Sequence, residues 1–77
     1  MPERVHSVQA VVEYLESGHS EVFLVFPNES VAEVRAVNGD KYELDLHELN
    51  GEGPPTETAD TISRIRIVLK KWERMCR

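Results

Sequence analysis

The chain has 77 residues, a formal net charge of −5 and one cysteine, Cys76. This length predicts a single domain over residues 1–77, whose core supplies only about 3 to 5 kcal/mol and leaves no room for a large substrate cleft. The lone cysteine excludes an intrachain disulfide, and no apolar run approaches the roughly 18 residues of a membrane span. The acidic first segment, MPERVHS, lacks the pattern of a signal peptide, so we expect a cytoplasmic protein without membrane association.

Residues 7–17 form the first predicted element, a short amphipathic helix. Ser7 suits the N-cap, and apolar residues follow at a spacing of i, i+3, i+4 and i+7, which places them on one stripe. They are Val8, Val11, Val12 and Leu15. Gly18 ends the helix, and Glu13 and Glu16 lie on its opposite side, so we interpret it as a packing element.

Residues 20–26 form the next predicted element, a strand. Residues 21–26 are almost continuously apolar, which is typical of a strand covered on both faces. If the turn that follows has four residues, 27–30, Phe23 and Val25 share the core face with the apolar row of the next strand. The alternate residues then form a second apolar row that two helices on one face leave uncovered, unless a sharply twisted sheet takes one helix on each side. This row predicts an interface, for which a homodimer is the expected use. It consists of Val22, Leu24, Phe26 and Val31.

Two alternating runs, residues 31–37 and 41–47, are joined by Asn-Gly, the strongest short-range signal for an antiparallel hairpin. A loop over residues 38–40 sets Arg35 opposite Glu43 and gathers the apolar side chains of both strands on one face. A loop over residues 37–39 keeps that face and suits glycine in its last position, but it pairs like charges. Charge favours the first loop and turn chemistry favours the second.

The last predicted element is a helix over residues 58–75, after a connector in which glycines and prolines forbid regular structure. Alternation around Ile65, Ile67 and Leu69 also suits a strand. The acidic residues Glu57 and Asp60 near its start and the basic residues at its end favour the helix, because they match its dipole. Ile67 then falls outside the main apolar stripe. The predicted fold is therefore α+β in the order α-β-β-β-α, a three-stranded antiparallel meander packed with two helices.

The expected core draws on all of these elements. It consists of Val8, Val11, Val12, Leu15, Phe23, Val25, Val34, Tyr42, Leu44, Ile62, Ile65, Leu69 and Trp72.

No catalytic constellation is visible in the sequence. The three histidines, His6, His19 and His47, have no cysteine or carboxylate at metal-ligand spacing, and no glycine-rich loop leads into a helix that could hold a phosphate. The alternating carboxylates Glu43 and Asp45 are interpreted as a solvated strand face rather than an acid–base pair. We therefore expect neither an enzyme nor a bound metal or cofactor.

Charge is divided unevenly along the chain. Residues 1–60 hold thirteen acidic residues against three basic ones, and residues 61–77 hold six basic residues against one acidic residue. The basic end could bind nucleic acid if its cations follow phosphates and its tryptophan stacks on a base, although the acidic remainder repels phosphate. This predicted basic patch consists of Arg64, Arg66, Lys70, Lys71, Arg74 and Trp72.

These observations favour a small non-enzymatic interaction or regulatory module that binds another protein or itself. An acidic mimic that occupies a nucleic-acid site is the alternative. By analogy of size, acidity and element order alone, small phage-encoded inhibitors of restriction and CRISPR nucleases work in this way. Nucleic-acid binding through the basic closing helix is a further alternative.

Overall fold

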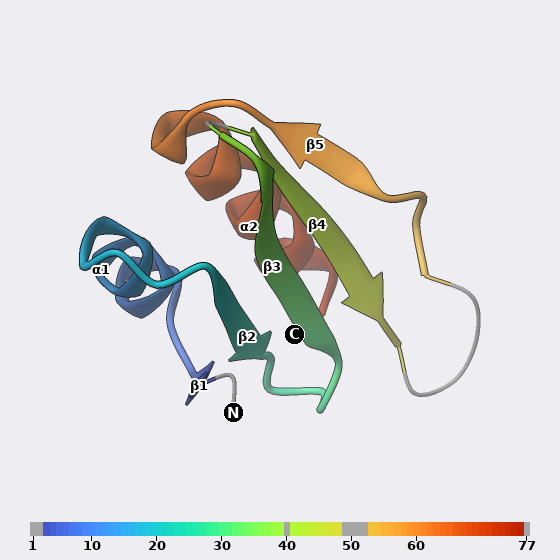
Figure 1. Cartoon of the computed structure of the whole chain (residues 1–77). Coiled ribbons are helices and arrows are strands. Elements are labelled where there is room, and N and C mark those ends of the chain that lie inside the picture. The colour runs from blue at the N-terminus through green and yellow to red at the C-terminus, as the bar shows by residue number, and fades with distance from the viewer. Residues whose placement is uncertain (1–2, 40, 49–52, 77) are drawn as a thin grey trace.

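The architecture, taken from a computed structural model, is described for residues 3–39, 41–48 and 53–76 (Figure 1). One mixed five-stranded sheet with strand order β1-β2-β3-β4-β5 organises it, with two helices. The elements are β1 (Glu3–Val5), α1 (Val8–Glu16), β2 (Glu21–Val25), β3 (Val31–Asn38), β4 (Lys41–His47), β5 (Glu57–Ala59) and α2 (Ile62–Met75). The predicted α+β class is confirmed, and the predicted meander is the central part of a larger sheet. The short edge strands β1 and β5 were not predicted.

Strand β1 runs parallel to β2, whereas every other neighbouring pair is antiparallel. Helix α1 makes the crossover between the two parallel strands, and α2 returns the chain behind the sheet (Figure 1). Both helices bury their apolar stripes against one face, which we call the covered face. Its strand residues include Val22, Leu24, Ala32, Val34, Leu44 and Leu46, all of them in the core. No described element packs on the opposite face, which we call the open face.

The first helix follows its sequence signals closely. The Ser7 side chain accepts a hydrogen bond from the amide of Ala10 at 3.1 Å, which satisfies one of the free N–H groups of the first turn. Gly18 ends the helix with a positive φ of 97°, a conformation that glycine adopts without strain. The four residues of the predicted apolar stripe are all buried.

The second helix begins later than predicted. Thr61 is its N-cap and accepts a hydrogen bond from the amide of Arg64 at 3.1 Å. The residues before it pair with β4 as strand β5, with Ala59 opposite Tyr42, so they are unavailable for a helix starting at residue 58. The helical prediction itself is confirmed, and the buried stripe is Ile65, Val68, Leu69 and Trp72.

The hairpin of β3 and β4 has the register that charge favoured. Arg35 lies opposite Glu43, and Ala36 lies opposite Tyr42. Beyond that pair a bulge shifts the register, so that Asn38 lies opposite Lys41. Gly39 has a φ of 54°, as a tight reversal requires. The last residue of the predicted loop, Asp40, lies outside the described residues.

The hairpin of β2 and β3 differs from the prediction by one residue of register. Val22 lies opposite Val34 and Leu24 opposite Ala32, so β2 presents its even-numbered residues to the covered face. The cause is the turn. The amide of Glu29 donates to the carbonyl of Phe26 at 2.9 Å, and the amide of Phe26 donates to the carbonyl of Ser30 at 2.9 Å. This closes a loop of three residues, not four, with Glu29 at a positive φ of 70°.

That shift exchanges the two faces of β2. The predicted core residues Phe23 and Val25 are half-buried on the open face, and this part of the core prediction is wrong. The predicted core residues Tyr42 and Ile62 are partly buried and pack against the core. The other predicted core residues are buried.

The connector after β4 is irregular where it is described, at residues 53–56, as the sequence predicted. Residues 49–52 of the predicted connector lie outside the described part. Gly53 passes so close to β4 that a Cβ atom there would overlap the carbonyl oxygen of Leu46. Only glycine fits this close approach of two backbones without a shift.

Candidate functional site

Three of the four residues of the predicted interface do not lie on the surface. Val22, Leu24 and Phe26 are 0%, 1% and 3% exposed, and all three belong to the core between the sheet and the helices. Their predicted position on an uncovered face is wrong, because the turn of the β2–β3 hairpin has an odd number of residues. Val31, the fourth residue of the set, does lie on the open face, where it is half-buried.

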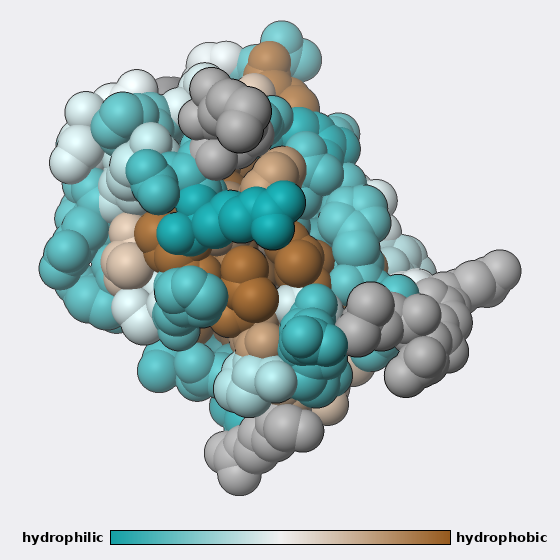
Figure 2. Space-filling view, turned by 90° about the horizontal axis from the view of Figure 1, so that it is seen from below, coloured by the Kyte–Doolittle hydropathy of each residue, from teal (hydrophilic) through white to brown (hydrophobic). Residues whose placement is uncertain are grey.

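The residues that the open face does present are the odd-numbered ones of the central strands. Phe23 and Val25 of β2 lie there with Val31 of β3, and each is half-buried without a helix above it. Figure 2 shows one end of the molecule, where apolar atoms gather among hydrophilic side chains. On the open face, Val25 and Val31 pair across β2 and β3 at the end of the strands nearest the turn that joins them. The sequence showed two apolar rows in β2, but the turn decided which one is covered.

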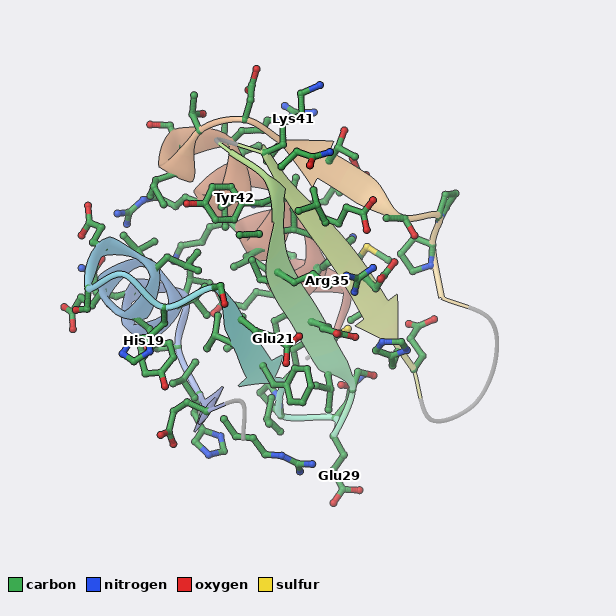
Figure 3. All side chains as sticks on the ribbon, in the orientation of Figure 1. His19, Glu21, Glu29, Arg35, Lys41 and Tyr42 are labelled. Carbon is green, nitrogen blue, oxygen red and sulfur yellow. The ribbon has the colours of Figure 1, made fainter. Side chains whose placement is uncertain are left out.

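Arg35 is the centre of a charge cluster on the open face. Its guanidinium lies 2.9 Å from carboxylate oxygens of Glu43 and Asp45 on β4, and 3.3 Å from Glu33 on its own strand. Figure 3 shows the Arg35 side chain reaching from β3 toward β4. Glu21 lies beside Arg35 in the register of β2 and β3. Three carboxylates of this face therefore contact one guanidinium, and Glu21 lies on the neighbouring strand.

Asp45 is the most strongly held of these carboxylates. The hydroxyl of Thr56 donates a hydrogen bond to it and, with the Arg35 guanidinium, holds the pKa of Asp45 below its ordinary value. The hydrogen bond to Asp45 in turn raises the pKa of Arg35. Because the charged forms of Asp45 and Arg35 stabilise one another, both groups stay ionised at neutral pH.

Charge also changes systematically across the open face. Arg4 of β1 pairs with Phe23 of β2, Phe23 with Glu33 of β3, and Glu33 with Asp45 of β4. These four residues form one row across four strands. The row begins with a cation at one edge, passes through an aromatic ring and ends with two anions.

The basic patch is only partly as predicted. Its five cationic residues are exposed on α2. Arg66 donates to Gln9 of α1 at 3.1 Å, Lys71 lies 2.8 Å from Glu57 of β5, and Lys70 lies 3.6 Å from Glu73. Trp72 is fully buried in the core, so its predicted role in stacking on a base is wrong.

A groove of about 670 Å³ lies where the tip of the β3–β4 hairpin meets β5 and the first turns of α2. Val37 and Ile67 line it and are among the most exposed large apolar residues described, at 43% and 58%. Lys41, Arg64 and Asp60 add charges of both signs. The position of Ile67 off the helical stripe was the one sequence signal for this groove.

The histidines lie apart from one another. His19 stacks on Tyr14 with ring centroids 3.8 Å apart, and Nε2 of His47 lies 3.3 Å from a carboxylate oxygen of Glu33. Within residues 3–39, 41–48 and 53–76, no three metal-ligating side chains converge. Neither described helix is long and apolar enough to cross a membrane.

Comparison with protein-family models, curated proteins and solved structures finds no match for this chain. The open face and its charges are therefore the basis for a functional proposal.

Proposed function

We propose that the protein is a small, cytoplasmic, non-enzymatic interaction module that binds a protein on the open face of its sheet. The observation that carries this proposal is an uncovered sheet face that combines apolar and charged side chains. Phe23, Val25 and Val31 supply the apolar part, and the cluster around Arg35 supplies the polar part. An apolar centre beside a polar rim is the usual composition of a protein interface.

The size of the chain supports the same proposal. A domain of 77 residues has a small core, and its stability is close to the limit for folding alone. A partner that binds only the folded state adds its binding free energy to that stability. Covering the half-buried residues of the open face removes further apolar area from water, at about 25 cal/mol per Å².

An acidic mimic of nucleic acid is the second candidate, favoured by the carboxylates of Glu21, Glu33, Glu43 and Asp45 on one face. Arg4 and Arg35 on the same face weaken this proposal. A basic protein groove that binds nucleic acid attracts the carboxylates but repels both arginines. We place it second for that reason.

The test compares two lysine variants, each expressed in the organism that makes the protein and isolated from those cells together with whatever it binds. Phe23→Lys places a charge on the open face, and Ile67→Lys places the same charge at an exposed position of α2. Complexes are separated by size-exclusion chromatography with light scattering, and each complex found is then rebuilt from purified components.

We expect wild type and Ile67→Lys to run in the same complex, with another protein or with themselves. Phe23→Lys is expected to keep its circular dichroism spectrum and run as an 8.8 kDa monomer. A wild type that runs alone as a monomer, or a Phe23→Lys variant that keeps the complex, contradicts the proposal.

A further inference from the structure

We infer that the protein bound on the open face is a second copy of this chain, related by a two-fold axis that runs parallel to the strands between β2 and β3. This inference rests on the proposed function and adds the identity and orientation of the partner. It follows from the order of side chains across the open face.

The operation can be traced strand by strand. Two sheets that pack face to face keep their strands nearly aligned, about 10 Å apart. An axis along the strands, placed between β2 and β3, sets β1 of one copy over β4 of the other and β2 over β3. It leaves each row of residues at the same height. Within each row, a residue of β1 therefore faces the residue of β4 in the second copy, and a residue of β2 faces the residue of β3.

Three contacts created in this way are complementary. Arg4 meets Asp45 of the second copy, because the row Arg4–Phe23–Glu33–Asp45 is reversed above itself. In the next row Val25 and Val31 pair within the sheet, so Val25 meets Val31 of the second copy.

The third contact lies in the row on the other side. Glu21 pairs with Arg35 within the sheet, so Glu21 meets Arg35 of the second copy. Each of these contacts occurs twice because the axis is two-fold. The apolar pair lies at one end of the interface, and the charged pairs lie beside it.

Other arrangements of two copies lack this complementarity. A two-fold axis across the strands sets β1 over β1 and β4 over β4, and where it crosses the row of Arg4 and Asp45 it brings each of these residues to its own copy. Stacking the open face on the basic surface of α2 pairs opposite charges. However, α2 lies behind the sheet, so the contact uses two different surfaces and leaves one of each free on every copy (Figure 1).

The remaining contact in the central row is Phe23 with Glu33 of the second copy. The Glu33 carboxylate is already drawn toward Arg35 at 3.3 Å and His47 at 3.3 Å, both on its own copy. Its aliphatic stem is left to face the ring. Stems of charged side chains commonly cover apolar surface in this way.

Charge reversal in two separate proteins tests the orientation. Arg4→Glu alone opposes Asp45 in both symmetric contacts, and Asp45→Lys alone opposes Arg4 in both. A heterodimer of the two variants restores opposite charge in one contact and keeps the native pair in the other. Sedimentation equilibrium at tens of micromolar measures each variant, their equimolar mixture and the control Arg74→Glu, which changes an exposed arginine of α2.

We expect wild type and Arg74→Glu to have twice the 8.8 kDa monomer mass. Each reversal alone should raise the dissociation constant at least about tenfold, and the mixture should recover it. Because Asp45→Lys also removes the Thr56 and Arg35 bonds, its fold is checked by circular dichroism. If it does not fold, the comparison of Arg4→Glu with Arg74→Glu decides alone.

The outcomes separate this inference from the proposal beneath it. A monomeric wild type overturns the two-fold dimer, while binding of another protein that Phe23→Lys abolishes still upholds the open face as a binding surface. A dimer that Phe23→Lys abolishes and Arg4→Glu leaves intact upholds the surface and overturns the orientation. A dimer that neither substitution affects uses another surface and overturns both.

Discussion

The two faces of the sheet are built from alternate residues of the same strands, yet they differ in what holds them. On the covered face, Leu24 and Leu44 are at most 1% exposed and pack against helical residues such as Leu69. On the open face, Phe23 is half-buried and its neighbours are charged. The covered face supplies the apolar burial on which folding depends. The open face leaves apolar and charged side chains that no described element covers.

This difference implies that substitutions of adjacent residues in β2 have different effects. A substitution on the covered face leaves a cavity that the surrounding core cannot fill, so it costs stability at any protein concentration. A substitution on the open face removes contacts that are only partly formed within one chain. Its larger effect is expected on the association that we propose for this face.

The largest expected effect comes from truncating the covered face. Leu24→Ala should lower the free energy of unfolding by about 2 to 5 kcal/mol, enough to unfold much of a domain this small. The neighbouring Phe23→Ala, studied at a low concentration where association is absent, should cost clearly less. Urea denaturation followed by circular dichroism measures both. Equal losses for the two variants would show that the faces do not differ as described.

The edge of β4 gives a second test, because a backbone rather than a helix packs there. Gly53→Ala forces the connector away from the carbonyl of Leu46 and should cost about 1 to 3 kcal/mol, the range of other overpacked sites. Gly18→Ala is the matched control. No atom lies within 4 Å of its new methyl group, so it bears only the strain of a φ of 97°. A Gly53→Ala variant as stable as Gly18→Ala would mean that the connector moves aside freely.

Acid should reduce the stability that the charge cluster of the open face contributes, because none of the described core residues of the covered face carries a carboxylate. Because the pKa of Asp45 is lowered on folding, its ionised form stabilises the native state at any pH above the ordinary pKa of 3.8. That contribution is lost as the pH falls through the lower folded value. Asp45→Asn should cost about 1 kcal/mol at pH 7, and its difference from wild type should shrink below about pH 4.

Urea titrations of both proteins at neutral and acidic pH measure this difference, with Glu16→Gln on the exposed side of α1 as the control. A cost for Asp45→Asn that stays constant down to about pH 3 would show that ionisation of this carboxylate does not stabilise the fold.

The sequence predicted the parts of the fold where local signals agree with long-range ones. Ser7 and the stripe after it predicted α1. Asn-Gly located the β3–β4 hairpin but left two registers open, and the structure has the one in which Arg35 lies opposite Glu43. The edge strands carried no comparable signal. Each has three residues, and each is a strand because a longer neighbour offers it free backbone groups. Pairing of that kind depends on the tertiary fold and not on local propensity.

The sequence indicated that β2 has an apolar row that the helices do not cover, but it assigned that row to the wrong residues. Two apolar rows in β2 indicated that one of them needs a partner, and this reading still supports an interaction module. The row was misassigned because strand residues alternate, so a turn with one residue fewer exchanges the two faces. The turn of three residues requires a positive φ at Glu29. A position of this kind is usually occupied by glycine or asparagine, and glutamate gives no such signal in the sequence.

The smallest expected effect tests that turn directly. Glu29 has a φ of 70°, and for a residue with a Cβ this conformation costs about 1 to 2 kcal/mol relative to a right-handed one. Asparagine tolerates it better, so Glu29→Asn should raise the free energy of unfolding by about 0.5 to 1 kcal/mol. Glu29→Ala is the matched control, because it removes the same carboxylate and keeps the strain.

Thermal unfolding of the three proteins at one concentration separates these effects. We expect the midpoint to rise by a few degrees for Glu29→Asn and to change little for Glu29→Ala. Equal gains for both would assign the effect to the lost charge, and no gain for either would mean that the turn holds Glu29 without strain. A gain for asparagine alone would confirm the three-residue turn, and with it the assignment of Leu24 to the covered face and Phe23 to the open one.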